Sequence, residues 1–248
     1  MKFKQFLYSV INGFILKSFN LKLSNSIGSD PINDMKQLLN NCEVTHIIDG
    51  GAYKGSFSFE ISKIYPSSNI YAFEPSHGSY TLLSNATSSN SMIKIFNYAL
   101  GSKTGKQEFH TNASSLTSSL HKSTKEGLKY FRGYIDPNGV EPVDVITLFD
   151  FLTREKIPSI DILKLDLQGH ELNALHGMGE QLGAVKLIYI EVEFSRIYQD
   201  QPLFSDIDKF LQEKGFFLYQ FYNFVRSPGD GRLLFGDAIF LNSNYVSL

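Results

Sequence analysis

The 248-residue chain is poor in cysteine and has no excess of positive charge, two features that mark particular classes of protein. It has one cysteine, Cys42, and therefore cannot form an internal disulfide or a zinc cluster of thiolates. Lysine and arginine number 23 against 25 aspartates and glutamates, so no basic field attracts nucleic acid and we expect no nucleic-acid partner. A chain with a single thiol suits a reducing compartment, and we expect a cytoplasmic protein.

A long hydrophobic run is also missing, although the first 40 residues form a basic, amphipathic leader. Its apolar residues recur at helical spacing from Phe3 to Ile15, and no acidic residue occurs before Asp30. The apolar stretch is too short to span a bilayer, and no small-residue cleavage site follows it. We expect residues 1–23 to form a helix that packs on its own domain or on a dimer partner, or lies on an anionic membrane surface.

From Asn41 onward, short β-rich runs alternate with amphipathic stretches, which is typical of a mostly parallel sheet covered by helices. Strands are predicted at Val44 to Asp49, Asn69 to Glu74, Ile93 to Ala99, Asp161 to Asp166, Lys186 to Glu193, Phe216 to Phe221 and Asp237 to Leu241. An extra hairpin strand is expected at Gly105 to Thr111. A turn-rich segment alone joins the last two strands, so we expect them to pair antiparallel. The prediction is a doubly wound, Rossmann-like α/β sheet with an antiparallel last strand, as in methyltransferases; dehydrogenases normally continue with parallel strands.

The segment Asp49 to Gly55, DGGAYKG, lies where a predicted strand ends and a predicted helix, Ser56 to Ile64, begins. Glycines at such a turn permit positive φ and let a ligand approach the backbone, and the helix N-terminus offers free amide groups. A dinucleotide-binding fingerprint requires glycine at its third position, where Ala52 stands when the count starts at Gly50. A nicotinamide-dependent oxidoreductase is therefore disfavoured. The alternative to a cofactor loop is a tight turn that binds nothing.

Two acidic residues close other predicted strands. Glu74 ends the strand that begins at Asn69, and Asp166 ends the strand that begins at Asp161. Because parallel strands share a carboxyl edge, both side chains are expected beside the loop that starts at Asp49. A carboxylate at Glu74 can accept hydrogen bonds from both hydroxyl groups of a ribose.

Five sequence motifs follow one another between Asp49 and Glu193: DGGAYKG, YAFEP, NYALG, ILKLDLQGHE and IYIEVE. In order and spacing they resemble the FkbM-type methyltransferases. The resemblance implies that residues 41–248 form one S-adenosylmethionine-dependent methyltransferase domain, which methylates a hydroxyl group of a sugar or another small metabolite. Two positions depart from the family pattern: Tyr53 stands where asparagine is frequent and Gln168 where glutamate is frequent, and the second change removes an acid beside the reaction centre.

The loop, the strand ends and the resemblance together predict one set of cofactor-binding residues. These are Asp49, Gly50, Gly51, Ala52, Tyr53, Gly55, Glu74, Pro75, Ala99, Leu100 and Asp166. All of them are expected at the carboxyl edge of the predicted sheet or in the loops that follow it.

Methyl transfer to an oxygen requires alignment of the acceptor and a group that takes its proton. Asp166 starts a loop at the expected mouth between cofactor and acceptor. We predict Asp166, Glu171 and Glu191 as candidates for the base. Glu171 is equally well explained as a first-turn carboxylate that stabilises its helix, and His170 as a capping or surface residue.

The sequence predicts no metal site. One converging set of carboxylates is available, Asp166, Glu191 and Glu193, and the last two face one side of a strand because they alternate with apolar residues. No HExxH pattern occurs, so zinc chemistry is unsupported.

Two segments bear on the acceptor, for which we expect a small molecule or a glycan. The Ser-rich segment Asn112 to Ser119 offers hydroxyl groups to a polar acceptor, or is a flexible linker. Four residues at helical spacing, Lys122, Lys125, Lys129 and Arg132, form either a solvated basic stripe or a contact for an acidic glycan. A third hypothesis is a non-catalytic protein that keeps the fold and binds the cofactor as a scaffold.

Overall fold

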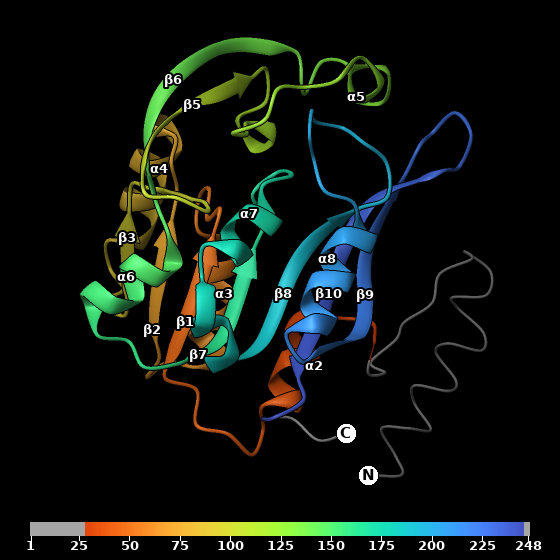
Figure 1. Ribbon diagram of the computed structural model, residues 1–248. Coiled ribbons are helices and arrows are strands. Elements are labelled where there is room, and N and C mark those ends of the chain that lie inside the picture. The colour runs from red at the N-terminus through yellow and green to blue at the C-terminus, as the bar shows by residue number, and fades with distance from the viewer. Residues whose placement is uncertain (1–27, 246–248) are drawn as a thin grey trace, which may run out of the picture.

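The computed structural model describes residues 28–245, and the predicted helix in residues 1–23 lies outside them. A seven-stranded sheet in the order β3-β2-β1-β7-β8-β10-β9 forms the centre of the domain (Figure 1). Its strands are β1 His46–Gly50, β2 Asn69–Phe73, β3 Ile93–Phe96, β7 Ile160–Leu165, β8 Val185–Glu193, β9 Phe216–Arg226 and β10 Leu233–Asn242.

The sheet has the mixed topology that the sequence predicts. The pairs β1–β2, β2–β3, β1–β7 and β7–β8 are parallel, whereas β10 lies between β8 and β9 and pairs antiparallel with both. The doubly wound sheet with a reversed last strand is therefore confirmed. The strand order changes direction at β1, which has β2 on one side and β7 on the other, and in such sheets ligands bind at the carboxyl edge near that point.

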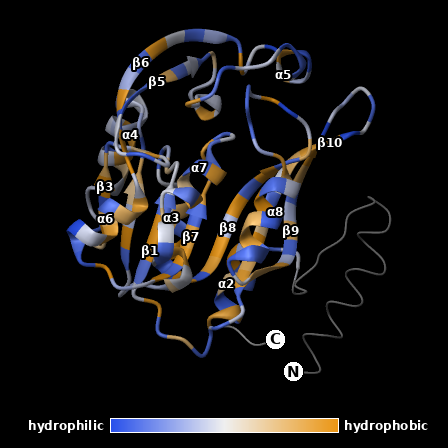
Figure 2. Ribbon diagram, in the orientation of Figure 1, coloured by the Kyte–Doolittle hydropathy of each residue, from blue (hydrophilic) through white to orange (hydrophobic). Residues whose placement is uncertain are grey.

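Helices cover both faces of this sheet (Figure 1). They are α2 Pro31–Leu38, α3 Ser56–Ile64, α4 His77–Thr87, α6 Leu148–Glu155, α7 Glu171–His176 and α8 Phe204–Glu213, with a short 3₁₀ helix η3 at Gly179–Ala184. Alternate strand residues serve two cores: Ile48 and Leu163 pack with α6, α7 and α8, whereas Ile47 and Ile162 pack with α2, α3 and α4. Burial on both faces explains why successive residues of β1 and β7 are apolar, such as Ile47 with Ile48 and Ile162 with Leu163 (Figure 2).

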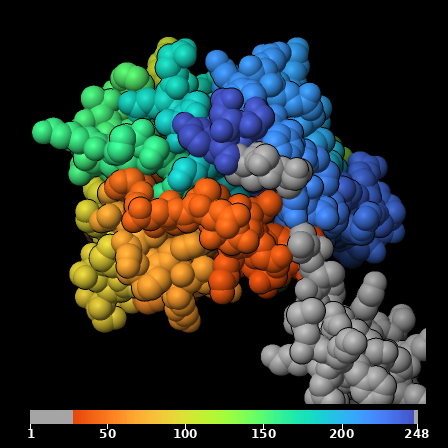
Figure 3. Space-filling view, turned by 90° about the horizontal axis from the view of Figure 1, so that it is seen from below, coloured from red at the N-terminus to blue at the C-terminus, as the bar shows by residue number. Residues whose placement is uncertain are grey.

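Helix α2, which belongs to the predicted leader, packs into the domain. Asp30 caps it by accepting hydrogen bonds from the amides of Ile32 and Asn33, and Met35 is fully buried in the core. The hydroxyl of Tyr222 in β9 donates to the Asp34 carboxylate over 2.6 Å. Figure 3 shows this red segment beside the blue C-terminal strands. No helix of residues 28–245 is long and apolar enough to cross a membrane.

A second sheet, of three strands in the order β4-β6-β5, arches over the carboxyl edge of the first (Figure 1). Its strands are β4 Ala99–Leu100, β5 Gly105–Asn112 and β6 Pro137–Ile146. The predicted strand from Ile93 to Ala99 is wrong in extent, because the chain leaves the large sheet after Phe96. The side-chain amide of Asn97 donates to the carbonyl oxygens of Glu74 and Pro75 at this point. The chain then continues into β4 of the small sheet.

The segment between β5 and β6 contains a 3₁₀ helix, η2 Ser115–Thr117, and the short helix α5 Lys125–Tyr130. The predicted basic stripe is wrong as a helix face, since Lys122 and Arg132 lie outside α5. The predicted extra strand at Gly105 to Thr111 is confirmed as β5, which pairs antiparallel with β6.

Candidate functional site

A cleft opens between the carboxyl ends of β1, β2 and β7 and the small sheet. We call it the central cleft; it measures about 620 Å³ out to its open mouth. Seven of the predicted cofactor-binding residues line it: Gly51, Tyr53, Glu74, Pro75, Ala99, Leu100 and Asp166. Apolar side chains that the sequence did not single out, including Phe73, Tyr98 and Phe109, complete its walls.

The other predicted cofactor residues do not line the central cleft. Asp49 is fully buried beneath the loop, where its carboxylate accepts a hydrogen bond from the Ser58 hydroxyl over 2.6 Å. Gly50 lies in β1, and Gly55 adopts φ +84° at the start of α3. Ala52 lines the neighbouring cleft described below. Of these four residues, Asp49, Gly50 and Gly55 line neither cleft.

The glycine loop is pressed against the loop that follows β7. Gly51 has φ +73°, and a Cβ atom there would lie 1.9 Å from the carbonyl oxygen of Asp166. Its amide and that of Ala52 donate to the Phe73 carbonyl. Tyr53 also has positive φ, +50°. Asparagine tolerates this region better than other non-glycine residues, which gives a physical reason for the asparagine that is frequent at this position in the family that the sequence resembles.

Glu74 is buried at the end of β2 and is held by two backbone amides. Its two carboxylate oxygens accept hydrogen bonds from the amides of Tyr53 and Ser76, each over 2.9 Å. Burial raises the pKa of the Glu74 carboxyl to about 7, although the two amide bonds oppose the shift.

Lys164, which the sequence analysis did not single out, contacts the glycine loop from below. Its buried ammonium group donates to the carbonyl oxygens of Gly50 and Gly51 and lies 3.1 Å from the Asp49 carboxylate and 3.8 Å from that of Asp166. Burial lowers the pKa of Lys164, but the two carboxylates outweigh it and the pKa lies above the usual value. A lysine within the apolar run ILKL was the available signal, because a buried lysine needs a partner.

A second, more open cleft of about 1050 Å³, the outer cleft, lies on the other side of the glycine loop. Gly51, Tyr53, Leu116 and Asp166 line both clefts. The side chain of Asp166 is 43% exposed. This carboxylate therefore stands at the boundary between the two clefts.

Gln168 connects two of the predicted base candidates. Its amide nitrogen donates to Asp166 over 2.8 Å and to Glu191 over 3.0 Å, while its amide oxygen accepts from the Tyr198 hydroxyl. Glu191 lines the outer cleft. A glutamate at position 168 would bring a third negative charge to this position, whereas the amide bridges the two carboxylates.

The third base candidate, Glu171, lines neither cleft. It is fully buried, and one carboxylate oxygen accepts hydrogen bonds from the amides of Leu167 and Gly169. His170 occupies the N-cap position of α7, as one of the two expectations had it, whereas the surface alternative is wrong. The ring is buried, makes no capping bond, and lies 2.9 Å from a ring nitrogen of His121. Burial and the proximity of His121 lower the pKa of His170 to about 3.

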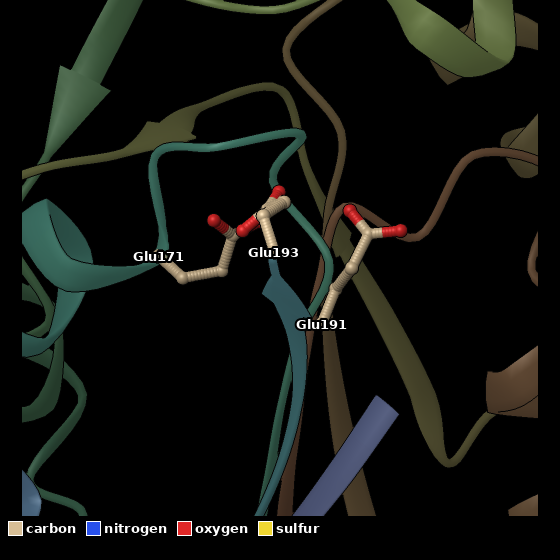
Figure 4. Close-up of side chains that lie close together, drawn as sticks. All are labelled: Glu171, Glu191 and Glu193. Carbon is tan, nitrogen blue, oxygen red and sulfur yellow. The ribbon is translucent and has the colours of Figure 1, made fainter. Parts of the chain in front are cut away.

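Three glutamates lie close together next to Gln168, which donates to one of them, Glu191. Glu171, Glu191 and Glu193 each offer a carboxylate oxygen within 4.8 Å of the others (Figure 4). The carboxylate set considered from sequence, with Asp166 in place of Glu171, is therefore not the one that the fold brings together.

A family model described as "Methyltransferase FkbM domain" matches residues 49–218, more than half of the chain. The chain is 24% identical over 170 residues to the 2-O-methyltransferase NoeI of Sinorhizobium fredii, which covers 65% of this chain and 69% of the relative. It is 22% identical over 156 residues to the hexuronic acid methyltransferase AglP of Haloferax volcanii, covering 60% of each. Among solved structures, the METTL16 MTase domain has the same fold, with a TM-score of 0.50 at 10% identity over 94% of this chain and 78% of that one.

Proposed function

The chain belongs to the FkbM methyltransferase family and is an S-adenosylmethionine-dependent methyltransferase, and from this premise we propose that it methylates a hydroxyl group of a sugar or another small metabolite. The observation that carries the proposal is the position of Asp166, whose carboxylate borders both clefts. Two relatives are named as a 2-O-methyltransferase and a hexuronic acid methyltransferase, which supports a sugar-like acceptor.

The central cleft fits S-adenosylmethionine. Glu74 presents a buried carboxylate for the ribose hydroxyl groups, and Gly51, which packs against the Asp166 backbone, lines the same cleft. Apolar residues such as Tyr98, Leu100 and Phe109 offer surfaces to an adenine ring. When bound there, the cofactor supplies an electrophilic methyl group on a sulfonium.

The residues at the boundary have distinct roles in the proposed reaction. The outer cleft holds the acceptor so that its hydroxyl oxygen points past Asp166 into the central cleft. Asp166 is positioned to accept the hydroxyl proton; a sulfonium methyl donor held in the central cleft would supply the methyl group, and its carbon–sulfur bond would break to leave the neutral thioether. Lys164 and Gln168 fix the Asp166 carboxylate in position, one from each side.

The charges of the outer cleft favour a neutral or cationic acceptor. Its walls carry five acidic side chains, from Asp30, Glu60, Asp166, Glu191 and Asp237, of which burial raises the pKa of Glu191 and Asp237, and the one basic side chain among the lining residues that the structure describes is Lys164. Lys164 is already paired with Asp49. An acceptor with its own carboxylate would meet repulsion here, so a neutral sugar or an amino sugar fits better than a uronic acid.

A transfer assay with a deuterated methyl donor tests the proposal. Neutral sugars, amino sugars and the matching uronic acids serve as acceptors, and mass spectrometry locates the added label. We expect label on oxygen with neutral or amino sugars at higher kcat/KM than with the uronic acids. Calorimetric titration with S-adenosylhomocysteine and, in parallel, NADH runs alongside. Binding of S-adenosylhomocysteine without transfer to any acceptor would favour the scaffold hypothesis, and binding of NADH alone would overturn the assignment.

The pKa of Glu74 predicts how cofactor affinity depends on pH. The ionised carboxylate accepts ribose hydrogen bonds, and with a pKa of about 7 its ionised fraction rises about tenfold between pH 6 and pH 8. The Kd of S-adenosylhomocysteine should therefore tighten by up to about tenfold over this range. Calorimetry at the two pH values measures it.

Glu74→Gln is the matched control for this pH dependence. The amide keeps the size of the side chain and does not titrate, so the variant should bind more weakly and with a Kd that is the same at pH 6 and pH 8. An unchanged pH dependence in the variant would assign the titration to another group.

A further inference from the structure

The glutamate cluster adjoins the outer cleft through Glu191, but the proposed transfer does not use it as a unit. Glu171 comes from the first turn of α7, and Glu191 and Glu193 come from the end of β8. In Figure 4 the carboxyl groups of Glu171 and Glu193 face one another, and that of Glu191 lies beside them. Glu171 is 0% exposed and Glu193 is 1% exposed.

Two oxygens of the cluster are buried without a hydrogen-bond partner. They are Oε2 of Glu171 and Oε2 of Glu193. The opposite oxygen of Glu171 is already used by two loop amides, so its free oxygen is held in a fixed direction. A buried carboxylate oxygen that no donor reaches is unfavourable in an apolar interior, and two at one place point to a missing positive ligand.

Within residues 28–245 the ammonium group of Lys164 attracts Glu191, but its ion pairs are with Asp49 and Asp166 and not with the cluster. None of its three glutamates forms an ion pair there. The charged groups with the strongest influence on Glu191 are Asp166, Glu193, Glu171 and Asp237, which are all acidic. The side-chain amide of Gln201 acts as a neutral donor toward Glu193 and lowers the pKa of that carboxyl, although Nε2 of Gln201 and Oε2 of Glu193 do not reach hydrogen-bond geometry. Burial and this mutual repulsion raise the pKa of all three carboxyls.

We propose that Glu171, Glu191 and Glu193 bind one divalent cation of the Mg²⁺, Mn²⁺ or Ca²⁺ class. Three carboxylate oxygens form the donor set that hard cations prefer, and the absence of imidazole and thiolate from the cluster disfavours zinc and copper. At the Ca²⁺–oxygen distance of about 2.4 Å, opposite ligands lie about 4.8 Å apart and the other pairs lie closer, so the three carboxylates would move together on binding, and further for Mg²⁺ at about 2.1 Å.

The surroundings leave room for the rest of a coordination sphere. Glu191 and Glu193 line a small cavity of about 280 Å³ between β8, Phe131 and Tyr198. Waters in this cavity could supply the ligands that three carboxylates leave open. Because Glu191 also lines the outer cleft, the cation would lie next to the acceptor site without belonging to the cofactor cleft. The inference does not depend on which acceptor is methylated.

Titration of the chelator-treated full chain with MnCl₂, MgCl₂ and CaCl₂ tests the cation site. We expect calorimetry to show one equivalent of at least one cation, and the Tm to rise with that cation. Glu193→Gln and Glu171→Gln should each weaken binding by at least about tenfold, since each removes one charged ligand. Glu213→Gln, an exposed glutamate at the end of α8, is the matched control and should bind as the wild type does.

The metal-free Tm separates loss of a site from loss of the fold. Removing one of three crowded charges relieves repulsion, so Glu193→Gln without metal should be at least as stable as the wild type while its Tm no longer responds to the cation. The salts are tested up to about 10 mM, which exceeds the Kd of the weakest protein calcium sites. If none of them gives heat or a Tm shift, the proposal is overturned, and the three carboxyl groups share protons instead of a cation. Undiminished binding in both cluster variants would also overturn it, because the cation would then lie elsewhere.

Discussion

Asp166→Asn is expected to lower kcat/KM by about 10²- to 10⁴-fold, the range for loss of a positioned base, with little change in the Kd of S-adenosylhomocysteine. The amide cannot take the acceptor proton, but it keeps the volume of the side chain at the boundary of the two clefts. Steady-state kinetics with the best acceptor, together with calorimetry, measure the two quantities separately.

The controls for Asp166→Asn distinguish proton transfer from charge and from folding. Asp144→Asn makes the same chemical change at an exposed site of the small sheet, in a pair with Lys106, and should leave kcat/KM unchanged. Glu191→Gln tests the other candidate in the outer cleft. A large loss in Glu191→Gln with near-normal activity in Asp166→Asn would make Glu191 the base and contradict our assignment.

The helices and strands with a regular hydrophobic periodicity were predictable from the sequence. Helix α3 spans Ser56–Ile64, as predicted, because an apolar periodicity starts directly after the glycine turn. Strand β6, Pro137–Ile146, was not predicted. It contains two prolines and a glycine and is mostly exposed, which are features that argue against a strand, yet it can pair because it lies in a small sheet away from the main core.

The positions of the candidate site residues at strand ends were predictable. Glu74 and Asp166 follow β2 and β7 and line the central cleft because a parallel sheet brings the ends of its strands to one edge. The glutamate cluster was not predictable in the same way. The alternation of β8 puts Glu191 and Glu193 on one face, but Glu171 reaches them only because the chain turns at Gln168 and Gly169, both with positive φ. The spacing of residues in the sequence does not predict that a non-glycine residue such as Gln168 adopts positive φ.

The role of Gln168 shows why a departure from a family pattern needs its structural context. From sequence, the missing glutamate removes an acid from the reaction centre. In the structure the amide donates to Asp166 and Glu191 at once and accepts from Tyr198, which no carboxylate could do. The substitution therefore fixes the two candidate bases in position, and it fits an active enzyme at least as well as a scaffold.

Lys164→Met is expected to have the largest effect on stability, lowering the free energy of unfolding by about 3–5 kcal/mol, because it leaves the Asp49 carboxylate buried without its cation. The same change removes the donor to the carbonyl oxygens of Gly50 and Gly51, so the glycine loop should also lose affinity for S-adenosylhomocysteine. Urea denaturation gives the stability, and calorimetry gives the Kd.

Two controls test whether the lost stability of Lys164→Met comes from the unpaired buried charge of Asp49: a double mutant and a variant of an exposed ion pair. Asp49→Asn combined with Lys164→Met removes the buried charge as well as its partner, so it should recover part of the lost stability, and the cycle gives the coupling between the two residues. Lys106→Met breaks the exposed pair with Asp144 and should cost less than about 1 kcal/mol. A loss in Lys164→Met no larger than that in Lys106→Met would show that the buried ammonium does not hold the loop. The cofactor loop would then depend on the close contact of Gly51 with the Asp166 backbone alone.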